Sequence, residues 1–584
     1  MSKKYYTSER NVQIIISLLK AHGIKKVIAS PGTTNMTFIG SIQHDSWFEI
    51  YSSVDERSAA YIACGMAEES GEPVVLSCTG ATASRNYIPG LTEAYYRKLP
   101  VLAITSHRGV HNIGHLLDQQ IDRRSIQNDI AMESVTIPMV DSSEDEQYCI
   151  IEGNKAILAL TRREGGPAHI NLYTRYSNDF SVKVLPSARV IKRFERCFGS
   201  MPSLKNKQIA VFIGSHKPFP SDTTIEIERF CEKYNAFVIC DHTSGYNGKY
   251  KIPFALIAGQ TMYRSSFKKM DILIHLGEVC GDAYSRSISP KSVWRISKDG
   301  ELRDSFRCLN NVFEMFEVDF FRYYNQGGPN KNTSRFEQCL MEYNSIYEKI
   351  EELPFGNLWI AKQMHNRLPM GCEIQFGILN SLRSWNFFPL DKSIKSNSNV
   401  GGFGIDGGVS SFIGASLMNK EKLYFGIFGD LAFFYDMNVI GNRHVGNNIR
   451  LLLVNNGKGN EFRLSMHPCN SFGDDADSYM AAAGHYGNKS RQLVKHFAED
   501  LGYKYLSASN KESFNKSIQV FLDHKIGEQS IIFEVFTEME DERDALDLLL
   551  STVADRKTEM QVKVVKAVKG TVFEGIIDVL NKLR

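Results

Sequence analysis

Short apolar segments alternate with amphipathic segments along most of the chain. In the first third, "KKVIAS", "PVVLSC" and "LPVLAIT" have the length of strands, whereas "SERNVQIIISLLKAHG" repeats its apolar residues at helical spacing. Apolar strands that are separated by helices are typical of a parallel sheet with helices on both faces. The pattern therefore predicts the α/β class, with doubly wound parallel sheets.

Breaks in this alternation divide the chain into three expected α/β domains and a tail. The first domain covers residues 1–185, and the polar stretch "MPSLKNKQ" precedes a central domain at 200–352. The third domain, 353–550, contains the apolar strands "LYFGIFGD" and "IRLLLVNNG". An amphipathic C-terminal extension at 551–584 is expected to be helical in part, and its pattern predicts no role.

Composition and charge are those of an ordinary globular protein. Apolar residues make up 43% and charged residues 23%, and the net charge is +2 without a basic face, so nothing indicates nucleic-acid binding. The start "MSKKYYTSERN" lacks the apolar core of a signal peptide, and no apolar run reaches the roughly 20 residues that cross a bilayer. The cysteines are scattered, mostly within apolar segments. We therefore expect a cytoplasmic protein that binds neither nucleic acid nor membrane.

Two polar motifs follow consecutive strands of the third domain. Asp430 follows "LYFGIFG", and Asn456 follows "IRLLLVN". Neighbouring parallel strands end at the same edge of a sheet, so these side chains are expected to lie close together. Their oxygen atoms suit Mg²⁺, and Gly429, Gly457 and Gly459 would let the backbone approach a phosphate. Each motif alone is also a common turn sequence.

Together the two motifs resemble those of the thiamine-diphosphate-dependent enzymes. In that family they bind the metal and the diphosphate, and a glutamate after a strand of the first domain serves the cofactor; "VDERSAA" places Glu56 at the corresponding position. The resemblance implies pyrimidine-binding, central and diphosphate-binding domains of the thiamine-diphosphate-binding fold. Within the family, "SPGTTN", "LTEAYYRKLPVLAIT", "GIDGGVS" and "GDLAFFYDMN" are similar to the menaquinone-pathway 2-succinyl-5-enolpyruvyl-6-hydroxy-3-cyclohexene-1-carboxylate synthases.

The resemblance implies roles for individual residues. Glu56 would hydrogen-bond the aminopyrimidine of thiamine diphosphate in a dry pocket; the alternative is a solvated acid at a helix start. Ile405 would hold the cofactor in its bent shape; the alternative is simple core packing. Asp430, Asn456 and the carbonyl of Lys458 would bind Mg²⁺. The other cofactor-binding residues that the resemblance implies are Gly80, Asn86, Gly404, Gly429, Leu431 and Gly459.

Gln119, in "LDQQIDRR", matches a family glutamine that reaches the substrate. It is the second candidate catalytic residue, and the alternative is a surface amide. His107, His111 and His115 recur every four residues, so a zinc site is conceivable, although no acid accompanies them.

A long segment with His467 and His485 follows the metal motif. Its position favours a lid over the active site. The alternative is a plain surface insertion.

The arginines that bind the substrates of the menaquinone-pathway synthases lack clear counterparts. Thr34 stands in "PGTTN" where their turn carries an arginine, and Trp385 and Val400 (or Asn399) align with two further arginines, although Arg383 lies nearby. Threonine and valine cannot bind a carboxylate in the bidentate manner of arginine. We therefore expect a small, pyruvate-like 2-oxo acid and a neutral or sugar-like carbonyl acceptor.

The predicted function is Mg²⁺- and thiamine-diphosphate-dependent decarboxylation of a 2-oxo acid, with transfer of the resulting acyl carbanion to a carbonyl acceptor. The alternatives are a simple decarboxylase that releases aldehyde, a menaquinone-pathway synthase, and a non-catalytic relative. In the family, one chain's first domain and another chain's third domain share each cofactor. The resemblance thus implies a homodimer or tetramer with active sites at the subunit interface.

Overall fold

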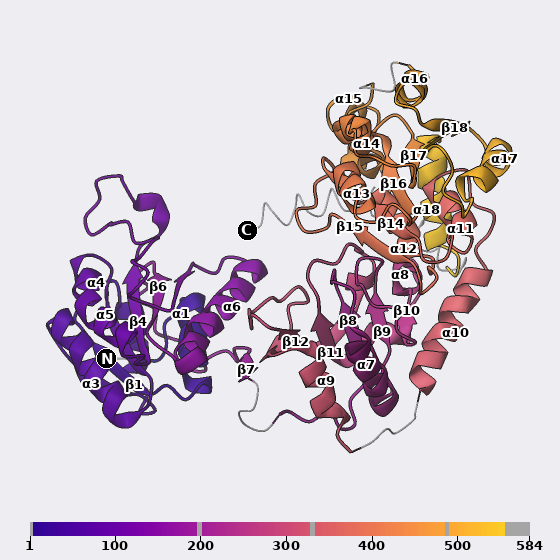
Figure 1. Cartoon of the computed structure of the whole chain (residues 1–584). Helices are drawn as coiled ribbons and strands as arrows, with labels where there is room; N and C mark the ends of the chain where they lie inside the picture. Colours follow the sequence, from indigo (N-terminus) through magenta and orange to yellow (C-terminus); the bar gives the residue numbers. More distant parts are fainter. Residues whose placement is uncertain (1–3, 196–200, 328–332, 485–489, 555–584) are drawn as a thin grey trace, which may run out of the picture. The chain divides into compact units, whose positions relative to one another are not determined.

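The computed structural model describes most of the chain (Figure 1), namely residues 4–195, 201–327, 333–484 and 490–554. Two compact units emerge from its internal contacts. Unit 1 comprises residues 1–199 with 300–314, and unit 2 comprises residues 200–299 with 315–584. The predicted α/β class with parallel sheets is confirmed.

Unit 1 contains a six-stranded sheet in the order β2-β1-β3-β4-β6-β5, in which every pair is parallel. Each strand is paired along its backbone, and helices precede β1 and connect most successive strands, whereas the described segment between β4 and β5 contains only the short 3₁₀ turn Val110–Asn112. The strands are β1 (Lys26–Ala29), β2 (Glu49–Ser52), β3 (Val74–Thr79), β4 (Val101–His107), β5 (Glu133–Ile137) and β6 (Ala168–Tyr173). The helices are α1 (Arg10–Ala21), α2 (Met36–Ile42), α3 (Glu56–Ser70), α4 (Thr82–Asn86), α5 (Ile88–Tyr96) and α6 (Ser143–Ala159).

Successive residues of the central strands point to opposite faces, and this alternation forms two hydrophobic cores. Val27 packs with residues of α1, α2 and α6, whereas its neighbour Ile28 packs with residues of α3 and α5. The sheet is therefore covered on both sides, as a doubly wound sheet requires. The edge strand β2 departs from the expected apolar burial, because all four of its residues are exposed.

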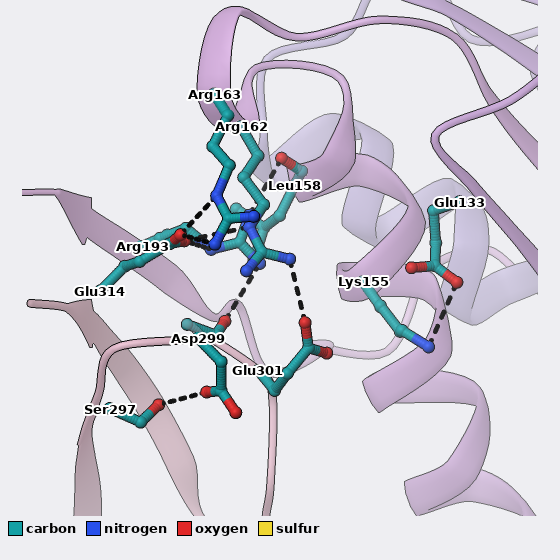
Figure 2. A network of polar contacts seen from close by, with 11 residues as sticks. Glu133, Lys155, Leu158, Arg162, Arg163, Arg193, Ser297, Asp299, Glu301 and Glu314 are labelled. Carbon is teal, nitrogen blue, oxygen red and sulfur yellow. Dashed lines mark hydrogen bonds and ion pairs between the residues drawn. The ribbon is translucent and has the colours of Figure 1, made fainter.

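Residues 300–314 join unit 1 through arginine–carboxylate pairs. Glu314, the last residue of β13 (Leu309–Glu314), accepts hydrogen bonds from Nε of Arg162 at 3.0 Å and Nε of Arg163 at 2.7 Å. Figure 2 shows Arg162, Arg163 and Arg193 converging on this carboxylate. β13 also pairs in parallel with β7 (Lys192–Glu195). Since the side chain of Glu314 is buried, loss of these partners would leave an unpaired buried charge.

Unit 2 contributes strands to two sheets. In the first, its strands follow the order β10-β9-β8-β11-β12, and these pairs are parallel. The second sheet has six strands in the order β15-β14-β16-β17-β19-β18, and its pairs are also parallel. The strands are β8 (Ile209–Ile213), β9 (Val238–Cys240), β10 (Lys251–Ile252), β11 (Lys269–Leu276), β12 (Ser289–Ser297), β14 (Glu373–Phe376), β15 (Lys395–Ser398), β16 (Tyr424–Gly429), β17 (Ile449–Asn455), β18 (Lys504–Ala508) and β19 (Ile531–Phe536). The helices are α7 (Ser221–Tyr234), α8 (Phe254–Gly259), α9 (Glu317–Asn325), α10 (Ser334–Glu348), α11 (Asn357–Met364), α12 (Asn380–Asn386), α13 (Gly408–Ser416), α14 (Asp430–Asp436), α15 (Asp475–Tyr479), α16 (Leu493–Asp500), α17 (Lys511–Phe521) and α18 (Met539–Leu550).

The expected domain boundaries, at 185, 200, 352 and 550, stay predictions. Most of the predicted C-terminal extension, residues 555–584, lies outside the described residues. Within the described part of the chain, no helix combines the length and the apolar character that crossing a bilayer requires.

Candidate active site

The two predicted metal motifs meet at one edge of the third sheet. β16 and β17 are parallel neighbours with Gly429 opposite Val454, so the residues that follow both strands come together. Oδ2 of Asp430 accepts a hydrogen bond from the backbone N–H of Gly457 at 2.6 Å. Its Oδ1 accepts from the N–H of Leu431 at 2.8 Å. Gly457 has φ +84°, a conformation that glycine adopts without strain.

Asp430 is a buried carboxylate, 4% exposed, and forms no ion pair with any described lysine or arginine. Burial raises its pKa to about 6, although the backbone hydrogen bonds oppose the shift. A divalent cation would favour the ionised form. The available donors are this carboxylate, the amide oxygen of Asn456 and the carbonyl of Lys458, a set of hard oxygen ligands that suits Mg²⁺.

The loop after β17 is held by the segment that follows it. Nζ of Lys458 donates to Oδ2 of Asp477 at 2.7 Å, and the N–H of Gly459 donates to the carbonyl of Ala481 at 2.6 Å. A Cβ at Gly459 would lie 3.1 Å from the ring of Phe462, so a larger residue would disturb this packing. The side chain of Lys458 is therefore occupied, and only its carbonyl remains a candidate metal ligand.

The predicted lid begins in this same segment. His467 accepts a hydrogen bond from the N–H of Cys469 at 3.2 Å and packs edge-on against Phe462. His485, the other histidine of the prediction, lies outside the described residues. A lid role for the segment stays a prediction.

The predicted cofactor-bending loop precedes α13. Ile405 is half-buried and Gly404 is exposed. The amide of Asn399 donates to the carbonyl of Gly407 at 3.2 Å and to Oγ of Ser411 at 3.0 Å, which ties the end of β15 to the start of α13. The loop is thus braced on the side of the helix, and the role of Ile405 stays a prediction.

In unit 1, Glu56 is the first residue of α3. Asp55 caps this helix, because its Oδ1 accepts the N–H of Arg57 at 3.0 Å. The amide of Asn86, at the end of α4, donates to Oε2 of Glu56 at 3.2 Å. The structure thus brings together two candidates from separate motifs. Glu56 is only half-buried, so the described part of this chain does not itself provide the expected dry pocket.

Gly80 lies at a point of close approach after β3. A Cβ there would be 2.6 Å from Cβ of His107 and 2.8 Å from both Nη2 of Arg123 and the carbonyl of Ser106. Only glycine fits this position. Burial, together with the charge of Arg123, lowers the pKa of His107 to about 3, so its imidazole is neutral.

Gln119 is exposed and has φ +56° in the long segment between β4 and β5, which leaves its substrate contact a prediction. His111 and His115 are exposed in the same segment, whereas His107 is buried at the end of β4. Among the described residues, no three His, Cys, Asp or Glu side chains are grouped to hold a metal ion. The structure therefore forms no zinc site from these histidines.

The first part of the chain matches a known enzyme family. The family described as "Thiamine pyrophosphate enzyme, N-terminal TPP binding domain" matches residues 10–127. The resemblance to thiamine-diphosphate enzymes is confirmed. This match covers the part of unit 1 that contains Glu56, Gly80, Asn86 and Gln119.

Relatives of similar length match most of the chain. A 2-succinyl-5-enolpyruvyl-6-hydroxy-3-cyclohexene-1-carboxylate synthase of Bacteroides fragilis is 27% identical over 561 residues, which cover 91% of this chain and 97% of the relative. The synthase of the same name from Phocaeicola vulgatus is 28% identical over 559 residues, covering 92% and 97%. That of Flavobacterium johnsoniae is 26% identical over 550 residues, covering 90% and 95%.

Thr34, Trp385 and Val400, the positions where the resemblance leads one to expect arginines, have structural roles in this chain. Thr34 is buried and donates to the carbonyl of Ser106 at 2.5 Å, while Trp385 and Val400 are core residues. Arg383 forms a bidentate pair with Glu461, at 2.6 and 2.8 Å. This arginine is therefore engaged by a protein carboxylate.

The sequence did not indicate that Arg123, in unit 1, is a buried cation. It belongs to "IDRRS", where Arg124 is chemically identical and exposed. No sequence signal separates the two arginines, because only the tertiary packing determines which one is buried.

Proposed function

We propose that this chain is a thiamine-diphosphate- and Mg²⁺-dependent enzyme that decarboxylates a pyruvate-like 2-oxo acid and transfers the acyl unit to a carbonyl acceptor. The proposal rests above all on the 2.6 Å hydrogen bond from Gly457 to Asp430. This bond joins the two motifs that are expected to bind the metal and the diphosphate.

The chain's own residues would bind and orient the cofactor. Asp430, Asn456 and the carbonyl of Lys458 would hold Mg²⁺. Thiamine diphosphate, when bound, supplies the electron-accepting ring that makes loss of carbon dioxide feasible. Glu56 would hold a proton at the aminopyrimidine N1′, and Asn86 would fix its carboxylate through their hydrogen bond. The remaining cofactor contacts proposed are the Gly80 loop, the backbone of Gly429, Leu431 and Gly459, and the Gly404–Ile405 loop; Gln119 would contact the substrate.

We further propose that the active enzyme is a homodimer or a tetramer. Several large apolar side chains near Glu56 are exposed, namely Val54, Tyr61 and Ile62. Exposed apolar surface of this kind favours association. A partner chain over this surface would also exclude water from Glu56, which is half-buried in the single chain.

The second candidate is the activity for which the relatives are named, 2-succinyl-5-enolpyruvyl-6-hydroxy-3-cyclohexene-1-carboxylate synthase. Similarity over more than nine-tenths of the chain favours it. The pairing of Arg383 with Glu461 and the burial of Thr34 favour a donor with fewer carboxylates. A simple decarboxylase would share the same cofactor-binding residues and differ only in its product.

One set of reactions tests these candidates. The protein with Mg²⁺ and thiamine diphosphate is incubated with a panel of 2-oxo acids, including pyruvate and 2-oxoglutarate, and carbon dioxide is measured. Active donors are then combined with carbonyl acceptors or with isochorismate, and the products are identified. We expect release from a small 2-oxo acid, lost in Glu56→Gln although the cofactor still binds. No release from any acid would refute the proposal, and release from 2-oxoglutarate with coupling to isochorismate would establish the second candidate.

A further inference from the structure

Arg123 is a buried cation without an anionic partner in the described part of the chain. Its side chain belongs to a residue that is 5% exposed, in the segment between β4 and β5. Nη1 donates to Oγ1 of Thr105 at 2.5 Å, whereas Nη2 has no hydrogen-bond partner. Burial lowers the pKa of Arg123 to about 10, so the guanidinium stays charged at neutral pH. An unpaired buried charge is strongly unfavourable, which indicates that an anion completes this site.

The pocket beside Arg123 is lined by a second cation and by no acid. Arg85 lines it together with Arg123, and its Nη2 donates to the carbonyl of Asp122 at 3.1 Å. Neither an aspartate nor a glutamate is among the described residues that line the pocket. The electrostatic character of the pocket therefore favours a negatively charged ligand.

Two further polar side chains of the pocket are uncharged. Tyr87 is fully buried, and its hydroxyl lies beside Ser30 and Cys78, so it adds no negative charge to the pocket. His169 lies between Oγ1 of Thr105 at 2.7 Å and Oγ of Ser134 at 3.0 Å. Burial lowers its pKa to about 3, so it introduces no competing charge.

The rest of the lining is largely apolar. Ile88, Leu91, Ile126 and Ile130 contribute aliphatic side chains. A ligand that matches both parts of the pocket has a carboxylate and a short aliphatic body. Inorganic anions would leave the aliphatic wall unmatched, and neutral ligands would leave Arg123 unpaired.

We propose that this pocket binds a short aliphatic carboxylate, with its carboxylate group on the guanidinium groups of Arg123 and Arg85. The pocket adjoins the candidate cofactor residue Gly80, because Ser84 lines the pocket and donates to the carbonyl of Gly80 at 2.9 Å. Binding of the carboxylate itself does not depend on the cofactor. The ligand is either the donor acid of the reaction or a separate effector of the same chemistry.

Thermal unfolding of the full chain tests the proposal with butyrate and butyramide, which differ in charge and scarcely in shape. We expect butyrate, and not butyramide, to raise the melting temperature. Arg123→Met is expected to weaken butyrate binding at least about tenfold, since hydrogen bonds to charged groups contribute roughly 1.5–3 kcal/mol. Arg123→Lys, which keeps the charge, is expected to retain part of the affinity.

Arg124→Met is the matched control. Arg124 is the next residue, its side chain is 64% exposed, and it pairs with Asp122 at 2.6 Å. This variant is expected to bind butyrate as the wild type does. Without ligand, Arg123→Met is expected to melt no lower than the wild type, because it removes an unpaired buried charge.

Three results would overturn the proposal: equal stabilisation by butyrate and butyramide, an undiminished butyrate effect in Arg123→Met, or a ligand-free Arg123→Met that melts several degrees lower. The last result would mean that Arg123 has a structural role. Kinetics separate the two sources of the ligand. A raised KM for the donor acid in Arg123→Met, with unchanged thiamine diphosphate affinity, would identify the donor, whereas an unchanged KM would identify an effector. Failure of the proposed function would give a different result: thiamine diphosphate would bind neither the wild type nor any variant, whereas butyrate would still bind the wild type.

Discussion

Asp430 and Glu542 are both buried carboxylates with a raised pKa, but they differ in what surrounds them. Asp430 lies at the edge of the sheet beside oxygen donors, where a cation can approach. Glu542, in α18, is fully enclosed and accepts hydrogen bonds from the N–H of Asn357 at 3.1 Å and from Oγ1 of Thr537 at 2.9 Å. It joins α18 to the first residue of α11. Burial raises the pKa of Glu542 to about 7, although its hydrogen bonds oppose the shift.

This shift predicts a pH dependence of stability. The pKa of Glu542 is near 4.5 in the unfolded chain and about 7 in the folded chain, so the folded state holds more protons between these values. Its contribution to stability is present below pH 4.5 and is lost as the pH rises through 7. The Glu542→Gln side chain stays neutral at every pH. At pH 8 the free energy of unfolding of this variant should therefore be about 1–3 kcal/mol higher than that of the wild type, and at pH 5 the difference should be much smaller.

Urea unfolding at pH 5, 6.5 and 8 measures this difference. The new amide N–H can donate to Oδ1 of Asn357, which is buried without a partner. The exposed Glu540→Gln on the same helix serves as the control and is expected to follow the wild type at every pH. A constant offset between Glu542→Gln and the wild type would contradict the prediction.

Asp430→Asn is predicted to separate stability from cofactor binding. The amide removes a buried negative charge but can accept only one of the two backbone hydrogen bonds, so these effects oppose each other and the metal-free protein should remain folded. Loss of the ionised ligand should weaken Mg²⁺-dependent binding of thiamine diphosphate by roughly 100-fold or more. Calorimetric titration of the cofactor at saturating Mg²⁺ measures this loss. Glu421→Gln, an exposed acid before β16, should bind normally; equal weakening in both variants would argue against a metal role for Asp430.

At the scale of elements, strands and helices with a strong apolar pattern were predictable. The segment "SERNVQIIISLLKAHG", with its apolar residues at helical spacing, contains α1, and Val12, Ile15 and Leu19 of this helix are buried. The polar strand β15, "KSNS", was not predictable. It pairs with β14 through its backbone, and its position at the edge of the sheet demands no apolar side chains.

The candidate site shows the same limit. The meeting of Asp430 with the loop after β17 was predictable from strand adjacency alone. The ion pair of Arg383 with Glu461 and the burial of Arg123 were not predictable from the sequence. Both depend on contacts between segments that are far apart in the chain. The local sequence pattern thus predicts which edge of the sheet carries the candidate site. Tertiary packing determines which charged side chains are left without a protein partner.

Asn399 offers a test at the same scale, since it braces the loop that contains Ile405. Besides its two donated bonds, Oδ1 of Asn399 accepts from Nε2 of Gln375 at 3.1 Å. Asn399→Ala should therefore lower the free energy of unfolding by about 1–2 kcal/mol. Chemical denaturation measures this change. Asn397→Ala, at an exposed position of the preceding strand β15, should change the free energy of unfolding by less than about 0.5 kcal/mol. Equal effects of the two substitutions would argue against a bracing role for Asn399.

For the whole molecule, the two halves of the proposed site lie in different compact units. Glu56 and Asn86 belong to unit 1, whereas Asp430 and Asn456 belong to unit 2. If two chains share each cofactor, the apolar surface near Glu56 must be covered before the cofactor can bind tightly. Cofactor affinity should then depend on association of the chains.

Two isoleucines make this dependence measurable. Ile62, on α3, is 46% exposed, and Ile225, on α7 of unit 2, is 47% exposed. An aspartate at either site places a charge on an exposed helix face, so neither change should disturb the fold. Ile62→Asp should shift the chain toward the monomer in light scattering and weaken thiamine diphosphate binding at least about tenfold, because a charge is costly in an apolar interface. Ile225→Asp should alter neither property. An Ile62→Asp protein that associates and binds the cofactor like the wild type would place the shared site elsewhere, since α3 would then lie outside the interface.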